Sequence, residues 1–251
     1  MTDLVSLMAV PMAAQALHFP EISPALVSID FGFVGLGTFH LRWYALAYIA
    51  GIMLAWQYAT ALISRPAMFG GKAPATKDDL DDIMFWIILG IILGGRLGYV
   101  LFYMVPYQQD VIAANPMSVL KIWDGGMSFH GGLIGVTLAI IVIARRRKLS
   151  LLPLGDIAGV VAPIGIMFGR IANFINAELY GRKTDAAVGM IFPEGVVPGS
   201  TPPAYDWVAK QWVYNGHEFA RHPSQLYEAA LEGLLPLLLL SILIWKFNAL
   251  K

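Results

Sequence analysis

The chain has 251 residues, of which 57% are hydrophobic and 14% are charged, and its formal net charge is zero. Soluble domains carry about 25% charged residues, so water is not the main solvent of this protein. A zero net charge provides no overall basic surface, and we predict no nucleic-acid partner. The chain contains no cysteine, which excludes disulfides, thiolate metal ligands and a cysteine nucleophile within the protein.

The amino-terminal segment does not have the composition of a signal peptide. Its first 20 residues contain an apolar stretch with no basic residue ahead of it, which fits a cleavable signal poorly. We interpret residues 1–42 as a lead-in on the outer face of a membrane. The whole chain, residues 1–251, is predicted to form a single membrane-embedded domain.

Five apolar segments are long enough to cross a bilayer, which takes about 20 helical residues. They are residues 43–63, 83–107, 125–144, 149–168 and about 226–245. The fourth contains Pro163, which is tolerated in such a helix where neighbours satisfy the freed backbone groups. The predicted fold class is therefore all-α, a polytopic transmembrane protein with about five spans.

Basic residues predict the orientation of these spans. Residues 145–148 are three arginines and a lysine, and clusters of this kind lie on the cytoplasmic side. The amino terminus and the loop over residues 170–225 then fall on the periplasmic side. A loop of that length, rich in Gly and Pro, is more often functional than a plain connection.

Two polar clusters interrupt the second and third apolar segments. The first is GGRLGY (94–99), whose glycines by themselves fit close helix packing, whereas Arg96 needs a carboxylate or phosphate partner. The second is WDGGMSFHGGLIG (123–135), in which His130 lies between two glycine pairs. His130 could accept a proton near neutral pH, but a structural hydrogen-bonding role is an equal alternative.

Two further clusters flank the long loop. GRIANFINAELYGR (169–182) follows the fourth span, and if it is helical then Arg170, Asn173 and Ala177 share one face. Its polar groups lie where a lipid headgroup would sit, which favours binding over a plain solvated turn. RHPSQLYE (221–228) precedes the fifth span, with Ser224 as a helix start and Arg221 as a candidate headgroup contact.

None of the four clusters contains a Gly-rich phosphate loop, an HExxH zinc pair or a GxSxG nucleophile turn. We therefore expect chemistry by polar stabilisation and proton transfer, with no metal and no cofactor.

Taken in order, the four clusters resemble the prolipoprotein diacylglyceryl transferase family of bacterial inner-membrane enzymes, over about residue 17 to the chain end. The resemblance implies phosphatidylglycerol as donor and the lipobox cysteine of a prolipoprotein signal peptide as acceptor, joined in a thioether, the first step of lipoprotein maturation. It also implies two further helices that the 251-residue chain lacks, so we expect it to be short at its carboxyl end.

Carried over residue by residue, the resemblance implies that Arg170 binds the lipid phosphate, and that Asn173, Glu178 and Gly181 complete that pocket. It also implies that His130 is the candidate base for the acceptor thiol and that Tyr44 belongs to the site.

The chemistry independently calls for charge stabilisation on the leaving phosphate, which arginines in a low-dielectric site provide. We therefore expect Arg96 and Arg170 to act as a clamp, with Arg221 as a further substrate contact. Two alternatives stay open. One is a truncated homologue that binds phosphatidylglycerol without turnover, and the other is a small transporter, which the missing repeat symmetry disfavours.

Overall fold

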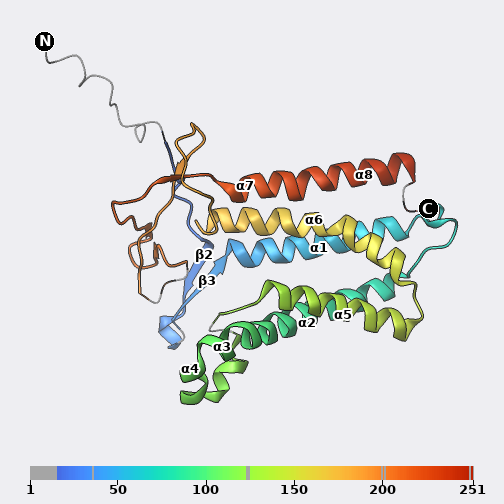
Figure 1. The fold of residues 1–251 in the computed structure, drawn as a ribbon, viewed down its shortest axis with the longest axis horizontal. Helices are drawn as coiled ribbons and strands as arrows, with labels where there is room; N and C mark the ends of the chain where they lie inside the picture. Colours follow the sequence, from blue (N-terminus) through green and yellow to red (C-terminus); the bar gives the residue numbers. More distant parts are fainter. Residues whose placement is uncertain are drawn as a thin grey trace, which may run out of the picture. The chain divides into compact units, whose positions relative to one another are not determined.

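The computed structural model describes residues 16–35, 37–122, 125–198, 200, 202–248 and 250. In this part of the chain five helices are long and apolar enough to cross a membrane (Figure 1): Trp43–Ile63, Lys77–Tyr107, Phe129–Arg147, Leu151–Ile175 and Ser224–Phe247. The predicted all-α class with five spans is therefore confirmed. Of the predicted lead-in over residues 1–42, residues 1–15 lie outside the described part.

The α-helices of the described chain have the following bounds. They are α1 (Trp43–Ile63), α2 (Lys77–Tyr99), α3 (Val105–Tyr107), α4 (Gln109–Ala114), α5 (Phe129–Arg147), α6 (Leu151–Ile175), α7 (Ser224–Glu228) and α8 (Leu235–Phe247). Two π-helical turns, η4 (Val100–Met104) and η7 (Ala229–Leu234), continue α2 into α3 and α7 into α8. Apolar side chains such as Leu97, Leu138 and Leu238 stay exposed on these helices, as expected of surfaces that face lipid tails.

Several helix bounds differ from the predicted ones. The second span begins at Lys77 because Thr76 and Asp79 form a reciprocal capping box, so its charged first turn is helical. α6 continues to Ile175, and Ala172 in its last turns is buried. Arg170 and Asn173 therefore lie on a helix, and the loop predicted from residue 170 begins six residues later. Ala177 has a left-handed φ of 51°, so it does not share their helical face.

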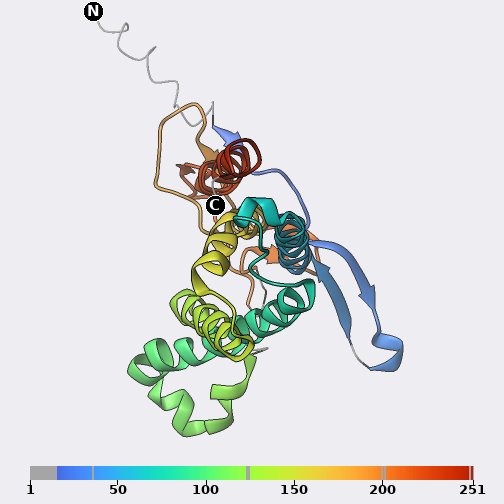
Figure 2. The same cartoon turned by 90° about the vertical axis from the view of Figure 1, so that its right-hand side faces the viewer.

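Contacts divide the chain into two compact units. The first comprises Met1–Ala55 and Val161–Ser241 and holds all the strands of the described chain. β1 (Leu17–His18), β4 (Met190–Ile191) and β7 (Ala220–Arg221) form one sheet, β2 (Ala25–Asp30) pairs with β3 (Thr38–Arg42), and β5 (Tyr205–Asp206) pairs with β6 (Gln211–Trp212). Figure 2 shows the β2–β3 hairpin leading into the beginning of α1.

Aromatic side chains form the core of this first unit. Phe19 lies edge-on to Trp212, with 5.3 Å between ring centroids, and also contacts Phe174 at the end of α6. Phe192 and Tyr180 stack on the same cluster. This core fixes the end of α6 to the strands that follow it, which is where Arg170, Asn173, Glu178 and Gly181 lie.

The second unit comprises Trp56–Val160 and Ile242–Lys251. Its main contact joins α2 to α5, which lie side by side in Figures 1 and 2. Glycines face one another across this contact: a Cβ added at Gly94 would lie 2.4 Å from the carbonyl oxygen of Gly131, and one added at Gly90 would lie 2.6 Å from that of Gly135. The glycines thus allow close helix packing, as their spacing indicated.

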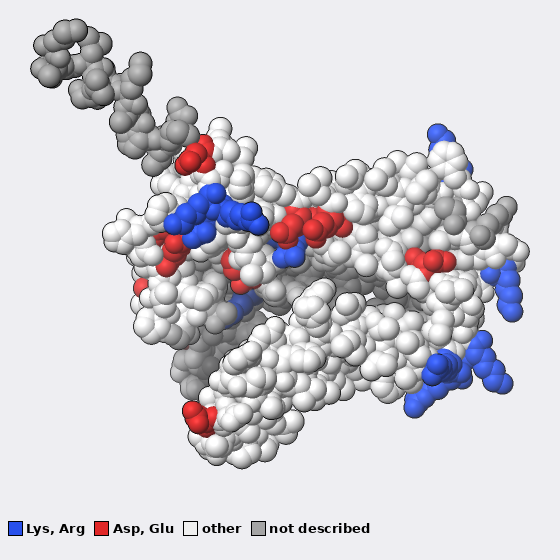
Figure 3. Space-filling model, in the orientation of Figure 1, with Lys and Arg blue, Asp and Glu red and all other residues white. Residues whose placement is uncertain are grey.

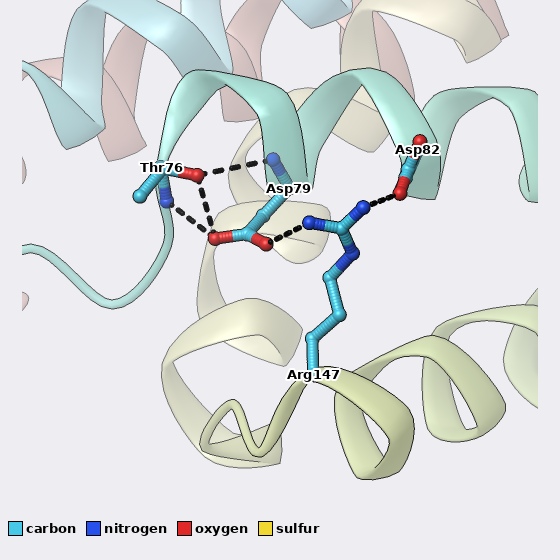
Figure 4. A network of polar contacts seen from close by, with 4 residues as sticks. All are labelled: Thr76, Asp79, Asp82 and Arg147. Carbon is cyan, nitrogen blue, oxygen red and sulfur yellow. Dashed lines mark hydrogen bonds and ion pairs between the residues drawn. The ribbon is translucent and has the colours of Figure 1, made fainter.

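A polar network links the first turn of α2 to the last turn of α5 (Figure 4). The Arg147 guanidinium donates to Asp79, with 3.0 Å between Nη1 and Oδ1, and its other terminal nitrogen pairs with Asp82. Asp79 also accepts hydrogen bonds from the backbone N–H and the hydroxyl of Thr76. One arginine therefore joins two helix ends that are far apart in sequence.

Candidate active site

Arg170 lies on the last turns of α6 and forms an ion pair with Glu228 at the end of α7. Its Nε lies 2.6 Å from Oε2 of Glu228, and the two side chains are 34% and 30% exposed. Among the described residues Arg170 has no other polar contact. Both terminal nitrogens of its guanidinium can therefore bind a ligand. A guanidinium in this state can bind a phosphate through two parallel hydrogen bonds.

Asn173 lies one turn further along α6 and holds Glu178. Asn173 is buried, and its Nδ2 donates to Oε1 of Glu178 over 2.8 Å. After the helix ends, Ala177 and Leu179 adopt left-handed φ angles of 51° and 57°, which turn the chain back toward α6. Tyr44, in the first turn of α1, interacts with both Asn173 and Glu178. The structure thus brings three of the predicted site residues together.

Gly181 and Gln225 position the turn that carries Glu178. The backbone N–H of Gly181 donates to the carbonyl of His222 over 2.8 Å, and a Cβ added at Gly181 would lie 3.0 Å from that same oxygen. Gln225 is fully buried and donates through Nε2 to the backbone carbonyl of Glu178 over 2.7 Å. Gly181, predicted as part of the phosphate pocket, therefore acts by allowing close backbone approach.

Arg221 is engaged in a separate ion pair. Its Nε lies 2.7 Å from Oε1 of Glu194, both side chains are mostly buried, and its guanidinium lies over the ring of Tyr180 at 5.1 Å. Burial raises the pKa of the Tyr180 hydroxyl, and the charge of Glu194 adds to this shift. Arg221 therefore has a protein counter-charge, as Arg170 does, but its side chain is less exposed, at 23% against 34%.

Two cavities adjoin these residues within the first unit. The Tyr44 cavity, of about 410 Å³, is lined by Phe39, His40, Leu41, Arg42, Tyr44, Ala45, Asn176 and Glu178. The Arg221 cavity, of about 460 Å³, is lined by polar groups that include Asn176, Glu178, Tyr180, Glu194, Asn215 and Arg221. Asn176 and Glu178 border both cavities. Their volumes lie within the usual range for ligand pockets.

Arg96, predicted as half of a phosphate clamp, is bound by backbone carbonyls instead. It is 8% exposed. Nε donates to Val119 over 2.9 Å, Nη1 donates to Gly125 and Gly126 over 2.6 and 3.1 Å, and Nη2 donates to Ser118. These carbonyls occupy each nitrogen of the guanidinium. Arg96 thus does not need an anionic partner, because an arginine at membrane depth can be satisfied by carbonyls as well as by an anion. Its contact with a phosphate stays a prediction.

His130 lies in the first turn of α5, in the second unit. Ser128 caps this helix by accepting a hydrogen bond from the N–H of Gly131 over 3.2 Å, and its own N–H donates to the Gly95 carbonyl over 2.9 Å. The His130 side chain is exposed, so its imidazole is accessible to a substrate. Trp123 and Asp124 of the same motif lie outside the described residues.

Two buried amides adjoin the site: Asn176 belongs to the polar cluster predicted to bind a headgroup, whereas Gln225 was not predicted as a functional residue. Asn176 and Gln225 are 8% and 0% exposed, and neither Oδ1 of Asn176 nor Oε1 of Gln225 has a hydrogen-bond partner among the described residues. Buried unsatisfied amide oxygens are rare in folded proteins. Asn176 belongs to a recognised motif, and Gln225 could have been noticed as an uncharged polar residue at the start of an apolar helix.

Comparisons with known proteins agree in pointing to one family. The model of the family "Prolipoprotein diacylglyceryl transferase" matches residues 32–251. Proteins named phosphatidylglycerol–prolipoprotein diacylglyceryl transferase are similar to this chain along most of its length. The one from Caulobacter vibrioides is 50% identical over 236 residues, 93% of this chain and 75% of the relative. That from Cereibacter sphaeroides is 46% identical over 92% of this chain and 72% of the relative, and that from Agrobacterium fabrum is 44% identical over 98% and 76%.

Proposed function

Because the chain belongs to the prolipoprotein diacylglyceryl transferase family, we propose that it transfers the diacylglyceryl group of phosphatidylglycerol to the cysteine thiol of a prolipoprotein. The observation that carries this proposal is the grouping of Tyr44, Asn173 and Glu178 beside a cavity with apolar and cationic walls. Arg42 offers this cavity a positive charge, Phe39 and Leu41 offer apolar contact, and Glu178 is the carboxylate in its lining. An anionic amphiphile fits it better than it fits the Arg221 cavity, whose lining holds two carboxylates.

The proposed reaction exchanges one bond for another. The thiol sulfur forms a bond to the glycerol carbon, the bond between that carbon and the phosphate oxygen breaks, and glycerol phosphate leaves with the electron pair. The thiol proton passes to His130, whose imidazole is exposed and so accessible to the substrate. The cysteine nucleophile belongs to the substrate, in accord with a chain that contains none.

Arg170 stabilises the negative charge that develops on the leaving phosphate. Its Nε stays paired with Glu228 while its terminal nitrogens bind the phosphate oxygens. We do not include Arg96 among the proposed phosphate ligands, since backbone carbonyls bind its guanidinium. We also leave Arg221 out of the phosphate contacts, because its side chain is less exposed than that of Arg170 and its guanidinium lies over the Tyr180 ring.

We place the protein in the bacterial inner membrane with its amino terminus in the periplasm. The support is the basic cluster at the end of α5, which follows the positive-inside rule. Figure 3 shows basic side chains over that end of the helix, whereas the length of α5 before it carries no charge on this face. The segment between α6 and α7 then lies on the periplasmic side, where prolipoproteins arrive.

The test compares the rate of thioether formation on a lipobox-cysteine peptide by the wild-type chain, Arg170→Ala and Arg146→Ala. We expect Arg170→Ala to lower the rate at least about 100-fold, since a charge-stabilising donor is worth roughly that much. Arg146 is exposed at the end of α5, so its variant should keep the wild-type rate. Wild-type turnover by a folded Arg170→Ala protein would refute the role of Arg170. Saturable lipid binding by a wild-type chain that forms no thioether would instead support the non-catalytic alternative.

A further inference from the structure

The Arg221 cavity lies in the part of the chain that joins two membrane helices. Its lining runs from Asn176 to Arg221, whereas α6 ends at Ile175 and α7 begins at Ser224. No residue of a long apolar helix lines it. We therefore expect the ligand of this cavity to come from the aqueous phase, and the acyl chains of a lipid are poor candidates.

The charges of this cavity disfavour a phosphate. Its cation, Arg221, is neutralised by Glu194 at 2.7 Å and covers the ring of Tyr180. Glu178 adds a second carboxylate to the wall. A phosphate entering here would meet two carboxylates and a single paired arginine, which is unfavourable. A neutral ligand rich in hydrogen-bond donors fits better.

Asn176 supplies an acceptor for such a ligand. It is 8% exposed, and its Oδ1 has no partner among the described residues. A buried amide oxygen without a hydrogen bond is unfavourable, so a ligand that donates a hydrogen bond to it binds more tightly. The N–H groups of an extended polypeptide are donors of this kind.

Asn176 and Glu178 also form the wall that this cavity shares with the Tyr44 cavity. A chain held in the Arg221 cavity would therefore have its next residue beside the cavity that we assign to the lipid. In a signal-bearing substrate the apolar part precedes the modified residue and the polar mature part follows it. The polar side of the acceptor is thus the one that matches this cavity.

We propose that the Arg221 cavity binds the polypeptide acceptor on the carboxyl side of its reactive cysteine, with Asn176 accepting a hydrogen bond from a main-chain N–H. This inference rests on the proposed function for the identity of the substrate. The binding step itself needs no donor lipid, so it can be measured apart from transfer.

The test measures binding of two labelled peptides to the full chain in phosphatidylcholine nanodiscs, by fluorescence anisotropy. One peptide ends at the lipobox cysteine and the other continues about six residues beyond it. Val196→Trp places an indole at the cavity border, where Val196 is 76% exposed. Val208→Trp is the matched control, since Val208 is 95% exposed and borders neither cavity.

We expect wild type to bind the longer peptide about tenfold more tightly than the shorter one. Val196→Trp should remove this preference, and Val208→Trp should keep it. Asn176→Leu, which keeps the side-chain size, should weaken binding of the longer peptide about fivefold, the order expected for one hydrogen bond.

Equal affinities of the two peptides for wild type, or an unchanged preference in Val196→Trp, would overturn the assignment of this cavity. A rise in the KM for phosphatidylglycerol in Asn176→Leu, with peptide affinity unchanged, would assign the acceptor oxygen to the lipid instead. Failure of the proposed function would give a different result. The wild-type protein would form no thioether but would still bind the longer peptide more tightly than the shorter one.

Discussion

Three arginines in this protein have three different electrostatic environments. Arg170 pairs with Glu228 and is 34% exposed, Arg221 pairs with Glu194 at 23% exposure and lies over an aromatic ring, and Arg96 is enclosed by carbonyl groups. Sequence position did not distinguish them, because each lies in a glycine-rich or polar motif near an apolar segment. The partners that distinguish them come from residues 22 to 58 positions away along the chain, and single-sequence patterns do not report such contacts.

The environment of Arg96 predicts a positioning role. Arg96→Ala leaves several buried carbonyls without a donor, and we expect the melting temperature to fall by several degrees, in line with about 3 kcal/mol. The melting temperature of Arg96→Lys should fall nearly as far, since a single ammonium group cannot reach all the carbonyls that the planar guanidinium contacts. Thermal unfolding in detergent measures the change.

Substrate kinetics give the control for Arg96. The fraction of Arg96→Lys that folds should keep the wild-type KM for phosphatidylglycerol, because no lipid contact is removed. A variant of wild-type stability with a raised KM would restore Arg96 to the lipid site.

Among the helices, α2 and α5 show how adjacent glycines can have opposite roles. A Cβ added at Gly131 would lie 2.2 Å from the Gly94 carbonyl oxygen, whereas one added at Gly132 would meet no atom closer than Ile91 O at 3.9 Å. The repeated glycines predicted a close helix contact. They did not identify which member of each pair faces the other helix, since that depends on the rotation of α5.

Gly131→Ala should therefore destabilise the protein and Gly132→Ala should not. Overpacking of this kind costs about 1–3 kcal/mol, whereas alanine in an open helical position is neutral or stabilising by up to about 1 kcal/mol. Paired melting curves of the two variants measure the difference. Equal melting temperatures would mean that the two helices are not in contact at Gly131.

The network at the other end of these helices should have a small, salt-dependent effect. Arg147 is 40% exposed and bridges Asp79 and Asp82, so Arg147→Ala should cost no more than about 1 kcal/mol at low salt. The loss should shrink as salt screens the pairs. Arg146→Ala is the control and should leave the melting temperature unchanged at any salt concentration. A salt-independent loss would argue for packing by the arginine stem.

For the whole molecule, apolar length predicted the five spans well, and the bounds of α1 agree with the sequence at both ends. Two helix ends differ from the predicted ones because polar residues there are helical. They are the beginning of α2, near Thr76 and Asp79, and the end of α6, from Arg170 to Ile175. The short strands around β4 depend on pairing with β1 and β7 from distant parts of the chain, so local patterns did not predict them. The prediction of a single domain stays a prediction.

The chain has no cysteine, which makes its orientation straightforward to test. Ser150→Cys places a thiol between α5 and α6, and Val208→Cys places one between α6 and α7. In intact cells a membrane-impermeant maleimide should label Cys at position 208 and should label position 150 only after lysis. Labelling of position 150 in intact cells would reverse the proposed topology.

The most direct test of the account is the stoichiometry of the reaction catalysed by the purified 251-residue chain. Phosphatidylglycerol and a lipobox-cysteine peptide should yield thioether-modified peptide and glycerol phosphate in a one-to-one ratio, measured by mass spectrometry and phosphate analysis. This ratio is predicted because breaking one carbon–oxygen bond accompanies each carbon–sulfur bond formed. Glycerol phosphate released without modified peptide, or no product from a folded protein that binds the lipid, would contradict the assignment of this chain as a transferase.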